Sequence, residues 1–194
     1  MHFCLLISSP RSFGNTNEIC QPFMEGLSEC GAVYDQIFLH TLNITPCQGC
    51  MTCQNIPGEY GCAVRDDMQN LLGTILEADV LVFATPIYTW QATPPLKAVM
   101  DRMFGLNKFY GTAPREAMLS GKTIALIATC GYKPERGADL LDEAVRRYCK
   151  HSEINYGGMY AVQDVNGIED FTTEAAVEGA KQFVRDIVAS LGGV

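Results

Sequence analysis

Short continuous apolar runs recur along this chain. They fall at 3–8, 32–39, 79–85, 123–129 and 153–162, the last being the weakest. Runs of this length are typical of strands that are buried on both faces of a sheet. We therefore expect five strands, each with side chains packed on both sides.

Segments with a helical stripe of apolar residues separate and follow these runs. They cover 15–29, a stretch that begins at Asp66, 94–104, 137–150 and 174–191. In the first of them, Ile19, Phe23 and Leu27 recur every four residues, which places them on one face of a helix. Asp66 and Gln69 have the spacing of a capping box at the start of the second. Alternating strands and helices predict an α/β fold with a parallel sheet that helices cover on both faces.

Composition is consistent with a single folded domain over residues 1–194. Apolar residues make up 47% of the chain and charged residues 19%, which argues against disorder. The net charge of −8 disfavours binding to a phosphate backbone, so we expect no nucleic-acid partner. No stretch has the length of a bilayer crossing or the basic start of a signal peptide, so we expect a cytoplasmic protein without a membrane partner.

Ligands of such sheets bind beyond the carboxyl ends of the strands, where the strand order changes direction. The loop at 8–16, after the first run, is rich in hydroxyl groups and leads directly into a helix. Its helix N-terminus offers free N–H groups, Gly14 allows close approach, Ser9 and Thr16 offer hydroxyls, and Arg11 offers a positive charge. This pattern predicts a phosphate site, and an ordinary helix cap with a solvated turn is the alternative.

The loops after the third and fourth runs carry residues that suit a flat ring. The loop at 85–95 contains Ile87, Tyr88 and the only tryptophan of the chain, Trp90. Packing against a neighbouring subunit or the core is the alternative role for these aromatic side chains. In the loop at 129–132, Gly131 permits close approach of a ring or simply allows a tight turn. Together with the phosphate loop, these features favour FMN as the ligand.

Four cysteines lie close together in a long segment without periodicity, at about 40–65. Their spacing is Cys47-x2-Cys50-x2-Cys53-x8-Cys62. Thiolates at such spacing hold iron–sulfur clusters, and a [4Fe–4S] cluster is one hypothesis. A zinc site and free or redox-active thiols are the alternatives. We expect Cys4, Cys20 and Cys149, within predicted strands and helices, to be core residues, because a free cysteine packs as a small hydrophobic residue.

Two loop motifs resemble those of the NADPH-dependent FMN reductase family. Residues 9–11 (Ser-Pro-Arg) and 14–16 (Gly-Asn-Thr) resemble the phosphate loop of that family. Residues 85–88 (Thr-Pro-Ile-Tyr), with the following helix, resemble its second flavin loop. Residues 46–68, which include the cysteines, are similar to the iron–sulfur flavoprotein branch, whose last cysteine follows after a shorter gap. The resemblance covers roughly residues 1–132.

The resemblance implies a flavodoxin-like, doubly wound, five-stranded parallel sheet with strand order 2-1-3-4-5. It also implies bound FMN and a homodimer or homotetramer with the flavin near the interface. The residues that would hold the phosphate or surround the ring are Ser9, Arg11, Phe13, Gly14, Asn15, Thr16, Pro86, Ile87, Tyr88, Trp90, Thr129, Gly131 and Tyr132. A cluster, if present, would be held by Cys47, Cys50, Cys53 and Cys62.

Three hypotheses about function follow from these sites. The first is an FMN-dependent oxidoreductase that takes hydride from NAD(P)H and passes electrons to an unidentified small-molecule or protein acceptor. We expect no catalytic side chain in it, because the flavin supplies the chemistry. The second is an iron–sulfur flavoprotein that carries electrons between proteins. The third is a binding module that senses redox state through Cys47, Cys50 and Cys53.

Overall fold

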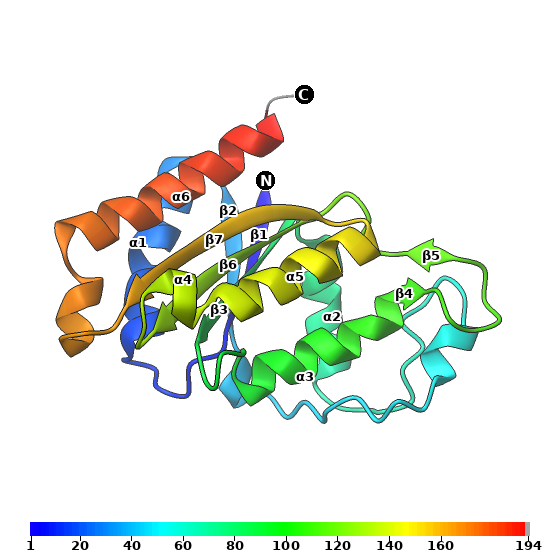
Figure 1. The fold of residues 1–194 in the computed structure, drawn as a ribbon. Helices are drawn as coiled ribbons and strands as arrows, with labels where there is room; N and C mark the ends of the chain where they lie inside the picture. Colours follow the sequence, from blue (N-terminus) through cyan, green and yellow to red (C-terminus); the bar gives the residue numbers. More distant parts are fainter. Residues whose placement is uncertain (193–194) are drawn as a thin grey trace.

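The computed structural model describes residues 1–192 and is built around a five-stranded sheet (Figure 1). All neighbouring strands in it are parallel, in the order β2-β1-β3-β6-β7. The order confirms the expected 2-1-3-4-5 arrangement, since β6 and β7 are the fourth and fifth strands of this sheet. The strands are β1 (His2–Ile7), β2 (Val33–Phe38), β3 (Val80–Pro86), β6 (Thr123–Cys130) and β7 (Asn155–Gln163).

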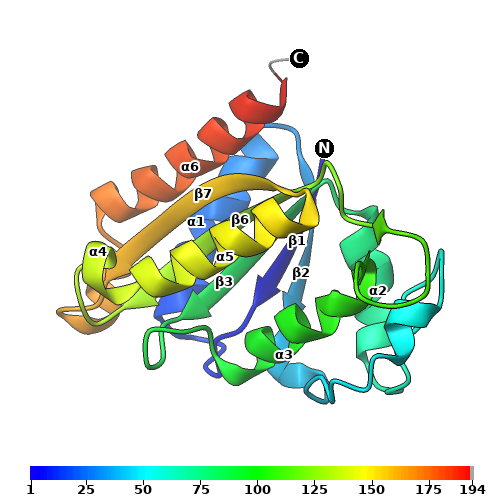
Figure 2. The same ribbon diagram turned by 45° about the vertical axis from the view of Figure 1, so that its right-hand side comes forward.

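Helices cover both faces of the sheet, as the sequence predicts. Helices α1 (Asn15–Glu29) and α6 (Glu174–Gly192) lie on one face (Figures 1 and 2). The other face is covered by α2 (Met68–Glu77), α3 (Pro94–Arg102) and α5 (Asp139–Ser152), and a single turn, α4 (Pro134–Gly137), precedes α5. None of the helices within residues 1–192 combines the length and the apolar character that a bilayer crossing requires.

Side chains of the central strands alternate between two apolar cores. In β1, Phe3, Leu5 and Ile7 pack towards α1 and α6, whereas Cys4 and Leu6 pack towards α2, α3 and α5. All five are fully buried, which explains why the strand appears in the sequence as an unbroken apolar run. The expected burial of Cys4, Cys20 and Cys149 is confirmed as well, since none is more than 1% exposed.

Several boundaries and one small sheet differ from the expectation; β7 begins at Asn155 and α5 at Asp139, each two residues later than expected. Helix α2 begins at Met68, two residues after Asp66. The expected capping pair is present: the Met68 amide donates to Asp66 Oδ1 (3.1 Å), and the Asp66 amide donates to Oε1 of Gln69 in the first turn (2.8 Å). Helix α3 ends at Arg102 and continues as a 3-10 helix, Met103–Leu106. An antiparallel pair, β4 (Asn107–Lys108) with β5 (Glu116–Ala117), was not expected, because strands of two residues leave no periodicity in a sequence.

The segment between β2 and α2, which contains the four clustered cysteines, has two short 3-10 helices, Leu39–Thr41 and Thr52–Asn55. Buried backbone groups still require hydrogen-bond partners where regular structure is absent. Buried side chains supply several of them. Gln54 is fully buried, donates to the carbonyls of Phe104 and Asn107, and accepts from the Phe109 and Tyr110 amides.

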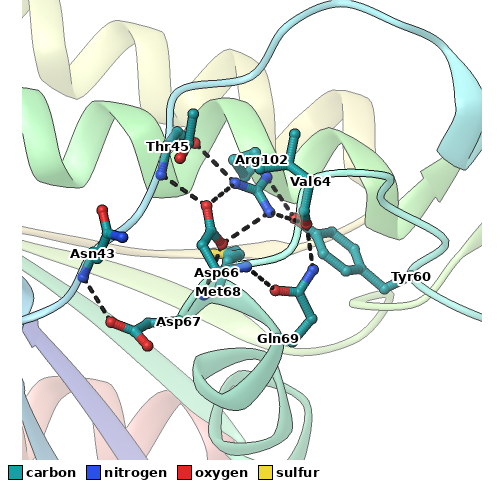
Figure 3. Close-up of polar contacts among 9 residues, drawn as sticks. All are labelled: Asn43, Thr45, Tyr60, Val64, Asp66, Asp67, Met68, Gln69 and Arg102. Atoms are coloured by element: carbon teal, nitrogen blue, oxygen red, sulfur yellow. Dashed lines mark hydrogen bonds and ion pairs between the residues drawn. The ribbon is translucent and has the colours of Figure 1, made fainter.

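Arg102 fixes both ends of the cysteine segment (Figure 3). Its guanidinium donates to the carbonyls of Thr45 (2.8 Å) and Val64 (3.3 Å) and makes two bonds to the Asp66 carboxylate (2.8 and 3.2 Å). The two side chains are 1% and 3% exposed. Burial alone would raise the pKa of Asp66, but hydrogen bonds from Arg102 and from the Thr45 and Met68 amides hold that pKa below its usual range.

Lys108 ties the middle of the same segment to the end of α3. Its ammonium group, 1% exposed, donates to the carbonyls of Cys53 (2.9 Å), Tyr60 (3.2 Å) and Gly105. Burial lowers the pKa of Lys108, and the neighbouring Cys53 and Glu116 act in the opposite direction. Two buried cations from one stretch of chain therefore organise the backbone around the four cysteines.

Replacing Arg102 with methionine (Arg102→Met) keeps an apolar stem and removes the charge. We expect the free energy of unfolding to fall by about 3–5 kcal/mol, because the Asp66 carboxylate is left buried without its partner. Urea denaturation followed by circular dichroism measures the change. The pKa of Asp66 is lower in the folded state than in the unfolded state. The ion pair with Arg102 therefore stabilises the fold fully at pH values above the unfolded-state pKa, and this stabilisation is lost as the pH falls through the folded-state pKa. The loss caused by Arg102→Met should therefore shrink in acid.

Asp101→Asn is the matched control, since it breaks an exposed ion pair at the end of the same helix. Lys97 and Asp101 are 2.6 Å apart, with side chains 50% and 45% exposed. Exposed pairs contribute about 0–1 kcal/mol, so this variant should stay close to the wild type. Equal losses in the two variants would contradict the special role of the buried pair.

Candidate functional site

A cavity of about 130 Å³ lies at the carboxyl ends of the central strands, and we call it the strand-end pocket. The sequence places loops after β1, β3 and β6 here, and the fold brings them together. All lining residues except Asp164 lie in the expected loops, and Cys130 is in the loop at 129–132 without having been assigned to the cofactor. They are Ser9, Arg11, Asn15, Thr16, Pro86, Ile87, Tyr88, Thr129, Cys130, Gly131 and Asp164.

A second cavity, of about 120 Å³, adjoins the first, and we call it the aromatic pocket. Both are lined by Ile87, Cys130 and Gly131, so the two cavities are contiguous. The other residues that line it are Thr89, Trp90, Tyr132 and Gly137. One end of the combined site is therefore polar and the other end is lined by flat rings.

Hydroxyl groups fasten the strand-end loops to one another. Thr93 Oγ1 donates to the Ser8 carbonyl (2.8 Å), and the hydroxyls of Thr16 and Thr129 are hydrogen-bonded (2.8 Å). The Ile87 amide donates to the Thr129 carbonyl (2.8 Å), which extends the pairing with β6 beyond the end of β3. Thr16, expected to offer its hydroxyl to a phosphate, is 1% exposed and holds α1 against β6. The loops therefore form a rigid rim.

The loop after β1 curls tightly around the start of α1. The Ser9 hydroxyl accepts from the Arg11 amide and donates to the Arg11 carbonyl (both 3.2 Å). A side chain at Gly14 would place its Cβ 3.0 Å from Arg11 Cβ, tighter than an ordinary contact, so glycine lets Arg11 lie close to the backbone here. Within residues 1–192, no side chain caps this helix, and its first amides stay available to an anion. Phe13 is 92% exposed and, like Gly14, does not line the pocket.

Asp164 is the residue that sequence reasoning missed. It follows β7, and its carboxylate accepts from the Asn15 side-chain amide (2.6 Å) and from the Gly167 amide (3.0 Å). Its own amide donates to the Cys130 carbonyl (2.8 Å). A signal was available, since β7 ends at the same edge of the parallel sheet as the three loops that were considered. The carboxylate brings a negative charge into a pocket to which Arg11 contributes a positive one.

A strained turn positions Trp90. Thr89 and Trp90 have φ values of 52° and 60°, which are left-handed conformations that side chains other than glycine rarely adopt. Reciprocal bonds between the backbones of Tyr88 and Gln91 close the turn. The indole N–H donates to the Arg136 carbonyl (2.8 Å), and the ring stacks on Tyr132 with centroids 5.9 Å apart and planes within 9°. The strain is maintained by these contacts, and strain of this kind is concentrated at binding sites.

The four clustered cysteines line one narrow pocket, the cysteine pocket, together with Arg102, Phe104 and neighbouring backbone. Its volume is about 20 Å³, which is close to that of one water molecule. Cys47 and Cys50 are exposed, Cys62 is half-buried and Cys53 is 9% exposed. In the part of the chain that the structure describes, no three Cys, His, Asp or Glu side chains converge closely enough to hold a metal ion.

The thiols of this pocket differ in acidity. Hydrogen bonds from the side chain and the backbone of Thr52 lower the pKa of Cys50. Burial raises the pKa of Cys53, and hydrogen bonding to Gln54 and the nearby Lys108 charge counteract the increase. The donors suit a metal–thiolate centre in their chemistry, but the loop would have to draw them together.

Comparison with known proteins gives the family context. A model of the NADPH-dependent FMN reductase family matches residues 1–156. An iron–sulfur flavoprotein of Archaeoglobus fulgidus is 29% identical over 143 residues, which are 74% of this chain and 61% of the relative. One of Methanocaldococcus jannaschii is 32% identical over 94 residues, 48% of this chain and 47% of the relative. The chain thus spans about half to three-fifths of the length of these curated relatives.

A solved structure confirms the expected fold. A flavodoxin from Streptococcus pneumonia TIGR4 superimposes with a TM-score of 0.60 at 17% identity, over 98% of this chain and 99% of that one. The expectation of a flavodoxin-like sheet is therefore confirmed, as is the expected family. Because the family model covers most of the sequence, from β1 to the start of β7, this chain belongs to the NADPH-dependent FMN reductase family.

Proposed function

We propose that this protein is an FMN-dependent oxidoreductase that takes hydride from NAD(P)H and passes the electrons to an acceptor. The observation that carries the proposal is the contiguity of a polar pocket and an aromatic pocket at the carboxyl edge of the sheet. FMN likewise has a polar end, its phosphate, and an aromatic end, its flat ring. When bound, the flavin supplies the hydride and electron chemistry.

The residues of the strand-end pocket would bind and orient the cofactor. Arg11 and the free amides at the start of α1 would hold the phosphate, and Asn15 is pre-oriented by Asp164. Ile87 and Gly131, which line both cavities, would lie where the ring begins. The loops are fastened to one another by hydroxyl bonds, so little ordering would be needed on binding.

The aromatic pocket would position the nicotinamide or the acceptor. Trp90 and Tyr132 present parallel rings there, held by the Arg136 carbonyl and by the strained turn. Stacking and exclusion of water are the contributions that such side chains make to hydride transfer. We assign no side-chain acid or base to the reaction.

Several expectations remain predictions. They are the cytoplasmic location, the homodimer or homotetramer, the acceptor, and the absence of nucleic-acid and membrane partners. Exposed aromatic residues beside the aromatic pocket, Tyr88 (48%), Trp90 (42%) and Tyr132 (62%), favour an oligomer in which a second subunit covers this edge.

The phosphate assignment predicts opposite effects for two substitutions in the strand-end pocket. Arg11→Met should weaken FMN binding by about 10- to 100-fold, the value of a charge-assisted contact, and leave riboflavin nearly unchanged. Asp164→Asn should strengthen FMN binding relative to riboflavin by about two- to fivefold, because it removes a negative charge near the phosphate. Flavin fluorescence titrations of the apoproteins give the affinities of the wild type and both variants for FMN and for riboflavin.

Asp186→Asn, on the exposed side of α6, is the control for Asp164→Asn and should leave the ratio of FMN to riboflavin affinity unchanged. Equal loss of both flavins in Arg11→Met would show that Arg11 does not hold the phosphate. Failure of the wild type to bind either flavin would overturn the proposed function itself.

The aromatic pocket predicts a kinetic effect. Trp90→Ala should raise the NAD(P)H concentration needed for half-maximal flavin reduction about two- to tenfold, since a stacked aromatic pair contributes about 0.5–1.5 kcal/mol. Stopped-flow measurement of flavin bleaching under anaerobic conditions gives this value. Trp90→Phe, which keeps a ring, should recover most of it. A half-saturating concentration that is the same in all three proteins would rule out stacking on Trp90.

A second function, electron transfer between proteins through a cluster, is favoured by one observation: all four clustered cysteines line the same pocket. Two relatives carry the name iron–sulfur flavoprotein. If this function holds, anaerobic reconstitution should give about four iron and four sulfide per chain. Cys50→Ser should lose most of that content, and Cys30→Ser, an exposed cysteine at the end of α1, should keep it. Iron and sulfide near zero in the wild type would contradict the cluster.

A further inference from the structure

The cysteine pocket holds four thiols that the proposed flavin site does not use. All nine cysteines of the chain are free thiols, and four of them, Cys47, Cys50, Cys53 and Cys62, line this one pocket. None of its lining residues belongs to the strand-end pocket or the aromatic pocket. Its volume of about 20 Å³ is close to that of one water molecule, so small movements of the lining side chains bring two sulfur atoms into contact.

Cys53 has two neighbouring thiols. Burial raises the pKa of Cys53, and the charges of Cys62 and Cys50 add to the increase, so both sulfur atoms lie near it. Cys62 also lies close to Tyr60 and Arg102, beside the buried ion pair of Figure 3. Cys50 is exposed, whereas Cys62 is half-buried. Of the two neighbours of Cys53, Cys50 is therefore the one that a reagent in solution reaches more easily.

The backbone is bent on both sides of Cys50. Gly49 and Met51 have φ values of 64° and 61°, in the left-handed region. Glycine adopts this conformation freely, but Met51 does so at a cost in free energy, and strain of this kind is concentrated at functional sites. Directly after Met51 the chain enters the 3-10 helix Thr52–Asn55, which contains Cys53. The bend thus places an exposed thiol at the entrance to the helix that carries a buried one.

A buried cation and an amide group lie beside Cys53. The Lys108 ammonium group donates to the Cys53 carbonyl (2.9 Å), and its charge acts on the thiol of the same residue. Gln54 Nε2 lies 3.9 Å from Cys53 Sγ. Both groups stabilise negative charge that develops on this sulfur. Because a disulfide opens faster when its leaving sulfur is stabilised, the pocket favours attack at Cys50 with Cys53 as the leaving group.

We propose that Cys50 and Cys53 form a redox-active dithiol, which a small-molecule disulfide oxidises to an intramolecular disulfide. The Cys50 sulfur attacks one sulfur of the small disulfide, the bond between the two sulfurs of that molecule breaks, and the first small thiol leaves. The Cys53 sulfur then attacks the Cys50 sulfur, the mixed disulfide breaks, and the second small thiol leaves. Each protein thiol gives up one proton and one electron, and the small disulfide is reduced to two thiols. An excess of small thiol reverses both steps.

This use of the cysteine pocket does not depend on the flavin, and it excludes a cluster on the same thiols. A disulfide between Cys50 and Cys53 removes two of the four sulfur ligands that a cluster would need. A chain in this state therefore holds no iron–sulfur cluster. The iron content of the protein decides between the two uses of the pocket.

Thiol trapping tests the proposal on the FMN-saturated protein, purified without oxygen and incubated with oxidised glutathione. The remaining thiols are alkylated with iodoacetamide, and peptide mapping by mass spectrometry locates every modified cysteine. We expect a Cys50–Cys53 disulfide that an excess of reduced glutathione removes. Cys53→Ser should stop at a mixed disulfide between glutathione and Cys50, because the second thiol is missing. Cys50→Ser should leave Cys53 as a free thiol, because that side chain is only 9% exposed.

Cys30→Ser is the matched control, since it removes an exposed cysteine at the end of α1, outside the pocket. The Cys50–Cys53 disulfide should form in this variant as in the wild type. The proposal is overturned if no intramolecular disulfide forms, if the disulfide joins Cys47 or Cys62 instead, or if the wild type holds about four iron atoms per chain and keeps them in oxidised glutathione. The flavin absorption of the same samples separates the two proposals. A disulfide without bound flavin would contradict only the proposed function, and bound flavin without a disulfide would contradict only the dithiol.

Discussion

The buried ion pair of Arg102 and Asp66 joins the helices that pack on the sheet to the cysteine segment between β2 and α2, which has little regular structure. Arg102 ends α3, and Asp66 lies just before α2, where it also caps that helix. The guanidinium binds carbonyls at both ends of the cysteine segment, and Lys108 binds further carbonyls in its middle. A segment with so little regular structure keeps one conformation because two buried cations pair with its backbone.

This arrangement separates two sites with different mechanical properties. The strand-end pocket is built on a parallel sheet, and hydroxyl bonds such as that between Thr16 and Thr129 fasten its loops. The cysteine pocket depends mainly on side-chain contacts, and its thiols range from exposed Cys50 to buried Cys53. A rigid site suits a flavin whose ring must stay aligned with the nicotinamide that would stack on it. Cys47 and Cys50, which are exposed, are the thiols that would move if the four were to draw together around a centre.

The sheet, its helices and most of the strand-end pocket could be predicted because their signals are local. An unbroken apolar run indicates a strand buried on both faces, and Asp66 with Gln69 indicates a helix start. The pairing of Arg102 with Asp66 joins residues 36 positions apart, and no local pattern encodes it. The same holds for Asp164 beside Asn15, and for the left-handed Thr89, whose conformation tertiary contacts impose.

The central claim is that the carboxyl edge of this sheet holds a flavin that NAD(P)H reduces. The most direct test is the visible absorption spectrum of the FMN-saturated, desalted protein, recorded without oxygen before and after NADPH or NADH is added. The account predicts flavin bands that stay with the protein and are bleached by one of the two nucleotides far faster than in buffer alone. A protein that loses FMN on desalting, or whose bound flavin is bleached no faster than in buffer, would contradict it.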